Sequence, residues 1–229
     1  MFDSPYTSSA REELLADHNE TQREAVVHGT GPLLVVAGAG TGKTRVLTRR
    51  VAWLAGGGLP ARALLAITFT NKAAEVLVER LARLLPGQRP QAGTFHSFCA
   101  RVLRSHGDAI GIGSDYTVLD REDQRRLLKN LLSDLGADAG RLKPPEIAAM
   151  ISHVKNGGGG RAPLDLRDAD VERIFDQVFE TYRARLRAGN LLDFDDLLLE
   201  ALRLLRDVEE VGESYRSRYA HVLVDEYQD

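Results

Sequence analysis

The feature that most constrains the fold is a run of apolar residues that leads without a break into a glycine-rich loop. Residues 33–36 read Leu-Leu-Val-Val, and the next eight residues read Ala-Gly-Ala-Gly-Thr-Gly-Lys-Thr. An unbroken apolar run is typical of a strand that is buried on both faces of a parallel sheet. The sequence therefore predicts a buried strand, a loop whose backbone N–H groups wrap phosphates, and a helix that begins near Lys43.

The residue types in this loop match the chemistry of a bound nucleotide. Lys43 would reach the β- and γ-phosphates, and Thr44 would place its hydroxyl on Mg²⁺. The first position of the usual G-x-x-x-x-G-K-[ST] pattern is Ala37, which is small enough to serve there. An ordinary glycine-rich turn would not need the apolar run before it or the periodic helix after it. We predict a nucleotide site made by Ala37, Gly38, Ala39, Gly40, Thr41, Gly42, Lys43 and Thr44.

A second motif lies at the other end of the sequence, where His-Val-Leu-Val at 221–224 runs into Asp225 and Glu226. A carboxylate at the carboxyl end of a strand beside a phosphate loop can hold Mg²⁺. A second carboxylate can orient or deprotonate the attacking water. We predict that Thr44 and Asp225 bind the metal, and that Lys43, Asp225 and Glu226 are catalytic. Without the phosphate loop, an Asp-Glu pair after a strand would more often be a solvated loop.

Composition sets the outer bounds. A chain of 229 residues can hold one large domain or two small ones, and 43% hydrophobic and 28% charged residues are ordinary for a soluble globular protein. The net charge of −3 gives no global sign of nucleic-acid binding, although a local basic groove would be enough. The single cysteine, Cys99, suits a reducing compartment. The polar first ten residues and the lack of a long apolar stretch favour a cytoplasmic protein without a membrane partner.

The pattern of predicted elements changes along the chain. The first part alternates: helix 19–28, strand 33–36, helix 43–55, strand 64–69, helix 72–85 and strand 91–94. This alternation predicts a parallel sheet with helices on both faces. From about Phe95 to Arg218 almost only helices are predicted, and the strand pattern returns at Val222. The economical interpretation is an α/β domain that is interrupted by an all-helical insertion.

Six segments together carry a family resemblance. They are Asn-Glu-Thr-Gln at 19–22, the loop at 37–44, Thr-Phe-Thr-Asn-Lys-Ala-Ala at 68–74, Gly-Thr-Phe-His-Ser-Phe at 93–98, Leu-Asp-Phe-Asp-Asp-Leu at 192–197 and Val-Asp-Glu-Tyr-Gln-Asp at 224–229. In this order they resemble the N-terminal part of superfamily 1 DNA helicases of the UvrD/Rep/PcrA type. The resemblance implies a RecA-like P-loop NTPase parallel sheet at residues 1–105 and 190–229, with an inserted all-helical subdomain at 106–189.

The resemblance also implies further nucleotide contacts. Gln22 would read the edge of adenine, because a side-chain amide can both donate and accept hydrogen bonds. Arg45, directly after the phosphate loop, would contact the nucleotide as well. The alternatives are a surface glutamine and a solvated helix arginine.

DNA contacts are implied at the ends of the predicted strands, where ligands bind in open α/β folds. An aromatic ring there can stack on any base, so such contacts tolerate different sequences. Phe69 and Phe95 could instead be core rings, and His96 could be a structural histidine. The residues implied to contact single-stranded DNA are Phe69, Asn71, Thr94, Phe95 and His96.

The activity implied is that of an ATP-dependent 3′-to-5′ DNA helicase of repair or replication, which uses ATP and Mg²⁺ on single-stranded DNA or a 3′-tailed duplex. The family adds a second RecA-like domain that is missing from these 229 residues, so we expect this chain alone to bind nucleotide without unwinding DNA. Two alternatives stay open: the helicase part of a nuclease-linked recombination enzyme, and a non-hydrolytic nucleotide- and DNA-binding module. An unrelated P-loop kinase or transporter ATPase would not explain the motifs at 68–74, 93–98 and 225–229 together.

Overall fold

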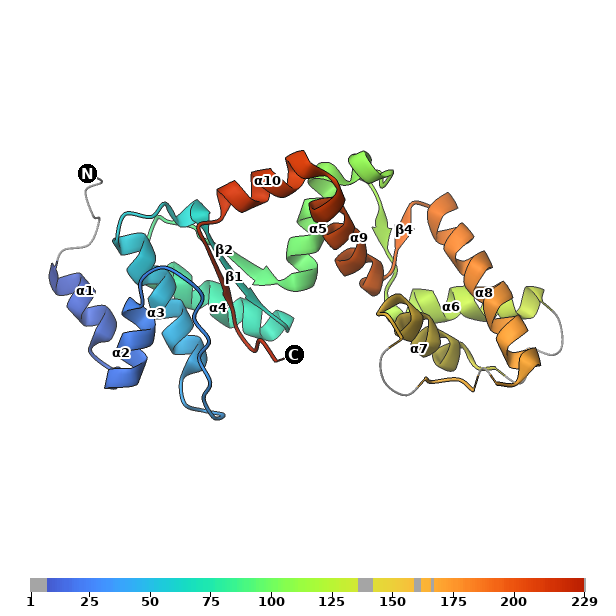
Figure 1. Cartoon of the computed structure of the whole chain (residues 1–229), viewed down its shortest axis with the longest axis horizontal. Helices are drawn as coiled ribbons and strands as arrows, with labels where there is room; N and C mark the ends of the chain where they lie inside the picture. The colour runs from blue at the N-terminus through green and yellow to red at the C-terminus, as the bar shows by residue number, and fades with distance from the viewer. Residues whose placement is uncertain (1–7, 136–141, 159–161, 166, 229) are drawn as a thin grey trace. The chain divides into compact units, whose positions relative to one another are not determined.

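The computed structural model describes residues 8–135, 142–158, 162–165 and 167–228. The chain divides into two compact units, the first unit (residues 1–98 and 210–229) and the second unit (residues 99–209). The second unit thus begins earlier and ends later than the predicted insertion at 106–189. Figure 1 labels the helices and strands of both units. None of the helices in the described ranges has the length and apolarity that a membrane crossing requires. Most of the polar N-terminal segment lies outside these ranges.

The first unit contains a parallel sheet of three strands in the order β2-β1-β5. All five residues of β1 are buried, as expected for a central strand with neighbours on both sides. Thr68, the last residue of β1, stands opposite Thr94, the last residue of β2, and β5 ends beside Ile67. The carboxyl ends of the three strands therefore meet at one edge. The strands are β1 (Leu64–Thr68), β2 (Gln91–Thr94) and β5 (His221–Val224).

The helices of the first unit pack around this sheet. They are α1 (Ser8–Leu15), α2 (Glu20–Val27), α3 (Lys43–Gly56), α4 (Asn71–Leu84) and α10 (Glu209–Arg218), with a short 3₁₀ helix η1 (Ala61–Ala63); α5 (Phe95–His106) begins in the first unit and continues into the second. Apolar residues of α3 and α4 form one core with β1, which fixes both helices relative to the strand that they flank in sequence. That core includes Val51, Ala55, Leu64, Ala66, Leu77 and Leu81.

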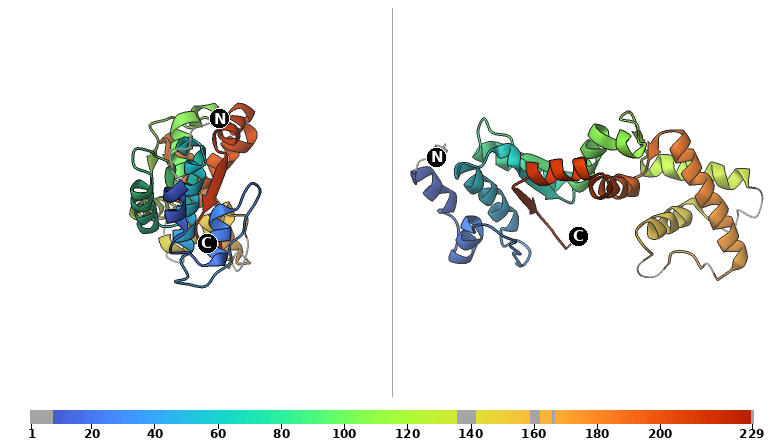
Figure 2. Two further views of the ribbon diagram at one scale, coloured as in Figure 1. Left: turned by 90° about the vertical axis from the view of Figure 1, so that its left-hand side faces the viewer. Right: turned by 45° about the horizontal axis from the view of Figure 1, so that its top comes forward.

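The predicted strand at 33–36 is wrong. The stretch between α2 and α3 has no strand arrow in Figure 1 or in either view of Figure 2, and it forms no ladder with any described strand. Leu34 and Val36 are 73% and 87% exposed. Because β1 already has a neighbour on each side, the run could pair only with a free edge of the sheet, and a hollow of about 510 Å³ separates residues 31–35 from the edge strand β5. An apolar run without a ladder partner cannot become a strand.

The start of α4 also differs from the prediction by one residue. The cap is Thr70, whose side chain accepts a hydrogen bond from the backbone N–H of Ala73 at 3.1 Å. Asn71, which precedes the predicted helix 72–85, is the first residue of the helix. Thr70 has extended backbone angles, as an N-cap residue does, whereas Asn71 is already part of the helix.

The second unit is mainly helical. Its elements are the 3₁₀ helix η2 (Gly107–Ile110), β3 (Thr117–Val118), α6 (Arg121–Asp134), α7 (Pro144–Lys155), α8 (Ala169–Ala188), β4 (Leu191–Leu192) and α9 (Phe194–Asp207). The prediction of an all-helical segment fails at β3, which pairs in parallel with β4. Strands of two residues are too short to give an alternating apolar pattern, so the sequence could not reveal them. The core of this unit includes Leu128, Ile147, Ile151, Val178 and Tyr182.

A buried polar group, the Lys155 cluster (Lys155, Tyr182, Asp193 and Asp196), ties α7, α8 and α9 together. The Lys155 ammonium lies 2.7 Å from a carboxylate oxygen of Asp193 and 2.7 Å from one of Asp196. The Tyr182 hydroxyl donates to Asp193 at 2.8 Å. Burial opposes ionisation of Asp193, but the charge and hydrogen bonds of Lys155 outweigh it and lower the pKa of Asp193. The motif at 192–197 therefore has a structural role here: Asp193 also caps α9.

Candidate nucleotide-binding site

The glycine-rich loop ends at the amino end of α3. Gly42 is the N-cap of this helix and has φ of 90°, and Gly40 has φ of 75°; both angles favour glycine. No side chain caps the helix at Gly42. The first N–H groups of an α-helix have no partner within the helix, and together with the helix dipole they favour an anion at this position. The predicted loop-to-helix transition at Lys43 is therefore present.

Thr44 and Asp225 meet although they lie 181 residues apart in sequence. The Thr44 hydroxyl donates to a carboxylate oxygen of Asp225 at 2.8 Å. Asp225 is 6% exposed, and its backbone N–H donates to the carbonyl of Ile67 in the central strand at 2.8 Å. The sheet thus holds the carboxylate against the start of α3.

This oxygen pair fits Mg²⁺ in its chemistry. Among the described residues no group of three or more His, Cys, Asp or Glu side chains could enclose a metal ion. Mg²⁺ does not need such a group, because it commonly keeps several waters and takes one or two protein oxygens together with phosphate oxygens. A hydroxyl and a carboxylate at hydrogen-bond distance supply that kind of donor set.

Lys43 and Glu226 lie at the same site. The Lys43 ammonium is 3.3 Å from the carbonyl oxygens of Ala37 and Gly38, so it folds back over the loop. Glu226 has φ of 54°, an uncommon left-handed conformation for glutamate, and its carboxylate accepts a hydrogen bond from Gln228 at 2.5 Å. Both side chains line a hollow of about 720 Å³ that also includes residues 40–42, Thr44 and Arg45.

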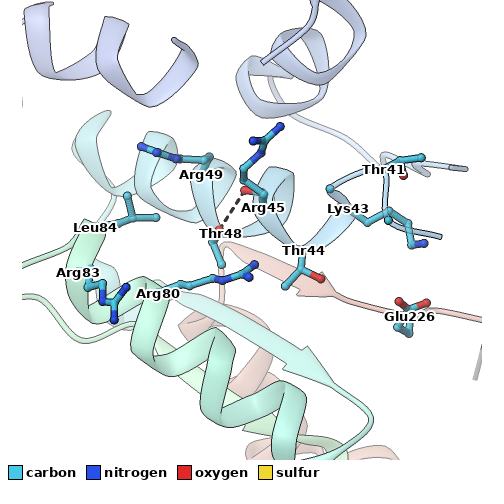
Figure 3. A pocket seen from close by; sticks show the side chains of 12 residues that line it. Thr41, Lys43, Thr44, Arg45, Thr48, Arg49, Arg80, Arg83, Leu84 and Glu226 are labelled. Carbon is cyan, nitrogen blue, oxygen red and sulfur yellow. Dashed lines mark hydrogen bonds between the residues drawn. The ribbon is translucent and has the colours of Figure 1, made fainter. Parts of the chain in front are cut away.

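This hollow, which we call the basic pocket, is strongly positive. Five cationic side chains line it against one carboxylate, that of Glu226. Arg83 forms a salt bridge with Glu79, whereas Arg45, Arg49 and Arg80 form no ion pair with any residue in the described ranges. Such a pocket favours a polyanion. The cationic residues are Lys43, Arg45, Arg49, Arg80 and Arg83, all of which appear in Figure 3.

Sequence reasoning did not identify Arg49 and Arg80. Arg49 follows Arg45 by four residues on α3, a spacing that places both on one helix face, so this signal was available. Arg80 extends from α4 towards α3, into the space beside Thr44 (Figure 3). Nothing in the sequence says which face of α4 packs towards α3, and Arg80 could therefore not have been found.

Gln22 lies against the phosphate loop. Its side-chain N–H donates to the carbonyl of Thr41 at 2.9 Å, and its side-chain oxygen accepts from the backbone N–H of Asn19 at 3.1 Å. Asn19 in turn caps α2 by accepting from the backbone N–H of Gln22. An amide with these two contacts keeps one N–H and one lone pair for a ligand.

His18 is a buried histidine next to the basic pocket. It is 5% exposed, and neither ring nitrogen has a hydrogen-bond partner among the described residues. Burial lowers the pKa of His18 below 6.5, and the nearby charges of Arg45 and Arg49 lower it further. The neutral imidazole is therefore the form that the folded state favours.

We expect the stability of the first unit to fall below pH 6.5, and His18→Leu to weaken this dependence. Because folding lowers the pKa of His18, the unfolded state takes up the proton more readily than the folded state. The contribution of His18 to the free energy of unfolding is therefore complete above pH 6.5 and is lost as the pH falls through the pKa of the folded state. Urea denaturation followed by Trp53 fluorescence between pH 5 and about pH 8 measures this. His153→Leu, in the second unit, is the control. An unchanged pH slope in His18→Leu would contradict the assignment.

The candidate DNA residues gather at the edge where the strands end. Phe69 follows β1 directly and Phe95 follows β2, and they are 51% and 36% exposed, which rules out their being core rings. Asn71 is exposed in the first turn of α4, and His96 is half-buried in α5. Thr94 is only 5% exposed, and its hydroxyl accepts from the backbone N–H of Ser97. The structure thus engages the Thr94 side chain in starting α5.

Comparison with known proteins agrees with this geometry. A family model described as "UvrD/REP helicase N-terminal domain" matches residues 18–229. Proteins named ATP-dependent DNA helicase UvrD1 from Mycobacterium bovis and Mycobacterium tuberculosis are 44% identical over 98% of this chain. ATP-dependent DNA helicase PcrA from Staphylococcus aureus is 39% identical over 94% of this chain. The chain spans about 30% of the length of these relatives. It belongs to the UvrD/REP helicase N-terminal domain family.

Proposed function

We propose that this chain is the ATP-binding, RecA-like part of an ATP-dependent 3′-to-5′ DNA helicase that acts in DNA repair or replication in the cytoplasm. The observation that carries the proposal is the pairing of Thr44 with Asp225 beside the basic pocket. Two motifs that are far apart in sequence supply the oxygen donors for Mg²⁺ next to the cations for a triphosphate. The names of the relatives extend the proposal to DNA.

In this proposal each residue of the site has a separate task. Loop residues 37–42 and the first N–H groups of α3 hold the phosphates, and Lys43 neutralises the β- and γ-phosphates. Thr44 and Asp225 hold Mg²⁺, which when bound neutralises charge on the phosphate oxygens. Glu226 orients the attacking water and accepts its proton. Gln22 reads the adenine edge, and Arg45, Arg49 and Arg80 add positive charge around the phosphates.

Single-stranded DNA, or the single-stranded part of a 3′-tailed duplex, is the proposed substrate. Phe69 and Phe95 offer exposed rings at one edge of the sheet, where bases could stack. Asn71 lies in the first turn of α4 and His96 in the first turn of α5. Thr94 contributes through the backbone conformation that it stabilises. The rest of the parent protein would supply the second RecA-like domain, and residues 106–189 would form the inserted subdomain.

Replacing Lys43 with alanine is expected to weaken binding of Mg-ADP by about 10- to 100-fold. A hydrogen bond to a charged group contributes about 1.5–3 kcal/mol, and tenfold in affinity corresponds to about 1.4 kcal/mol. Equilibrium titration with a fluorescent ADP measures the change. Lys129→Ala, which removes an exposed lysine of the second unit, should bind like the parent chain. Equal affinities of Lys43→Ala and the parent would refute the phosphate-binding assignment.

A non-hydrolytic binding module is the second candidate for the chain by itself. The favouring observation is that, among the described residues, every cation of the basic pocket lies on α3 or α4, whereas related P-loop enzymes gain much of their rate from an arginine supplied to the γ-phosphate. Nothing in the described residues favours the nuclease-linked alternative. Measurement of phosphate release separates binding from turnover.

A further inference from the structure

Arg50 of α3 is buried in the first unit without a carboxylate partner among the described residues. It is 7% exposed. One terminal nitrogen of its guanidinium donates to the carbonyl oxygens of His28 at 2.7 Å, Ala25 at 3.2 Å and Val26 at 3.3 Å. The other donates to the carbonyl oxygen of Gly29 at 3.3 Å. Burial lowers the pKa of Arg50, as expected for a cation that faces only neutral dipoles.

These four acceptors are the carboxyl end of α2 and the two residues that follow it. The last carbonyls of a helix have no partner within the helix, and a positive charge at that end is favourable. The guanidinium is planar and presents several donors in a fixed fork, so one side chain can satisfy a row of carbonyls. Arg50 therefore fixes the end of α2 to the middle of α3.

The opposite end of α2 is the end that meets the phosphate loop. There, Gln22 donates to the carbonyl of Thr41 at 2.9 Å. At a rise of about 1.5 Å per residue, Gln22 and the last residue of α2, Val27, lie about 8 Å apart along the helix axis. Each holds one end of α2 against the segment that begins with the loop and continues as α3. In the described part of the chain, the packing of α2 on α3 and the Gln22 hydrogen bond also relate α2 to this segment.

We infer that Arg50 is a positioning residue for base recognition: by fixing α2 it places the free N–H and lone pair of Gln22 where the base of a nucleotide in the phosphate loop is read. This inference rests on the proposed function, and it adds a determinant of base specificity to the same site. Arg50 does not line the basic pocket. Its removal should therefore reduce the preference for adenine more than the affinity for phosphate.

The test compares binding of Mg-ATP, Mg-GTP and inorganic tripolyphosphate to five chains: the parent, Gln22→Ala, Arg50→Met, the double variant and Arg50→Lys. The parent is expected to prefer ATP over GTP by about tenfold, the value of one well-placed hydrogen bond. Gln22→Ala and Arg50→Met should each reduce this ratio to about two or less, and the double variant should lose nothing more. Tripolyphosphate affinity should stay within about twofold in Arg50→Met. Arg62→Met, an exposed arginine in the same unit, is the control for loss of charge.

Arg50→Lys keeps the charge but not the fork of donors, so its ATP-to-GTP ratio should lie between those of the parent and Arg50→Met. If Arg50→Met fails to fold, as judged by circular dichroism and Trp53 fluorescence, the ATP-to-GTP ratio of Arg50→Lys tests the positioning role of Arg50. One result would overturn this inference and leave the proposed function standing. In it, the parent prefers ATP over GTP and Gln22→Ala does not, but the Arg50 variants keep the parental ATP-to-GTP ratio. A parent that binds ATP and GTP equally would remove the base-reading role of Gln22 and this inference together. Equal weakening of all three ligands would assign Arg50 to the fold alone.

Discussion

Replacing Lys155 with methionine is expected to destabilise the second unit by about 3–5 kcal/mol. The side chain is only 10% exposed and contacts two carboxylates at 2.7 Å, of which Asp193 is 3% exposed. Removing one partner of a buried ion pair leaves a charge without compensation in a medium of low polarity, and this accounts for a cost of that size. Two carboxylates sharing one lysine make the loss more severe, because they would then repel each other. Burial and the charge of Asp193 already raise the pKa of Asp196.

Urea denaturation followed by circular dichroism measures the loss, with hydrogen exchange of amides in α7 and α9 to assign it to the second unit. Trp53, the single tryptophan of the chain, lies in α3 and reports the first unit separately. Lys129→Met, at an exposed position of α6, should change stability by no more than about 0.5 kcal/mol. Adding Asp193→Asn and Asp196→Asn to Lys155→Met should recover part of the loss. A Lys155→Met chain as stable as the Lys129→Met control would show that the cluster contributes little.

The second large effect concerns turnover. The purified chain is expected to show no unwinding and no DNA-stimulated ATP hydrolysis. In related P-loop enzymes, an arginine supplied to the γ-phosphate accelerates hydrolysis by about 10³- to 10⁵-fold. The family resemblance implies that this arginine comes from a second RecA-like domain, whereas the basic pocket here is lined by residues 40–45, 48, 49, 80, 83, 84 and 226. An open pocket also admits water, which weakens each charge interaction within it.

Phosphate release would be measured with and without an oligothymidine strand, with a full-length relative assayed in parallel. Glu226→Gln serves as the control for contaminating enzymes, because it removes the proposed base without changing the size of the side chain. Stimulated turnover that disappears in Glu226→Gln would refute the expectation. It would mean that a group already present, with Arg80 as the first candidate, supplies the missing charge. Arg80→Met would then identify it.

The local elements around the candidate site were predicted better than the sheet. The glycine-rich loop, the helix from Lys43 and the acidic pair after β5 depend on local patterns, so their positions could be read from residue types alone. The meeting of Thr44 and Asp225 at 2.8 Å was expected from a sheet that included a strand at 33–36, and the pair forms although that strand is absent. The direction of the Arg80 side chain depends on helix packing, for which the sequence holds no comparable signal.

The failures have a common physical cause. Leu34 and Val36 were predicted to be buried because they are apolar, yet burial also requires a packed neighbour, and a hollow of about 510 Å³ separates residues 31–35 from the edge strand β5. The two-residue strands β3 and β4 form because the segments before α6 and after α8 come together in three dimensions. Lys155 was overlooked for the same reason: its partners are 38 and 41 residues away. Each of these depends on long-range contacts rather than on local pattern.

Because the run at 33–36 is unpaired, nucleotide affinity depends on how well the chain is ordered just before the phosphate loop. The adjoining loop, 37–42, is contacted at Thr41 by Gln22 and continues into α3, whereas no strand ladder fixes the residues before it, so nucleotide binding selects the fraction of molecules whose loop has the conformation that a ligand needs. The apparent dissociation constant is the intrinsic one divided by that fraction. Fixing one residue costs about 1–2 kcal/mol of conformational entropy, so pairing of even a few residues at 33–36 could change this fraction appreciably. A polypeptide segment that pairs with 33–36 would then tighten nucleotide binding without touching the nucleotide, and bound nucleotide would strengthen that pairing by the same factor.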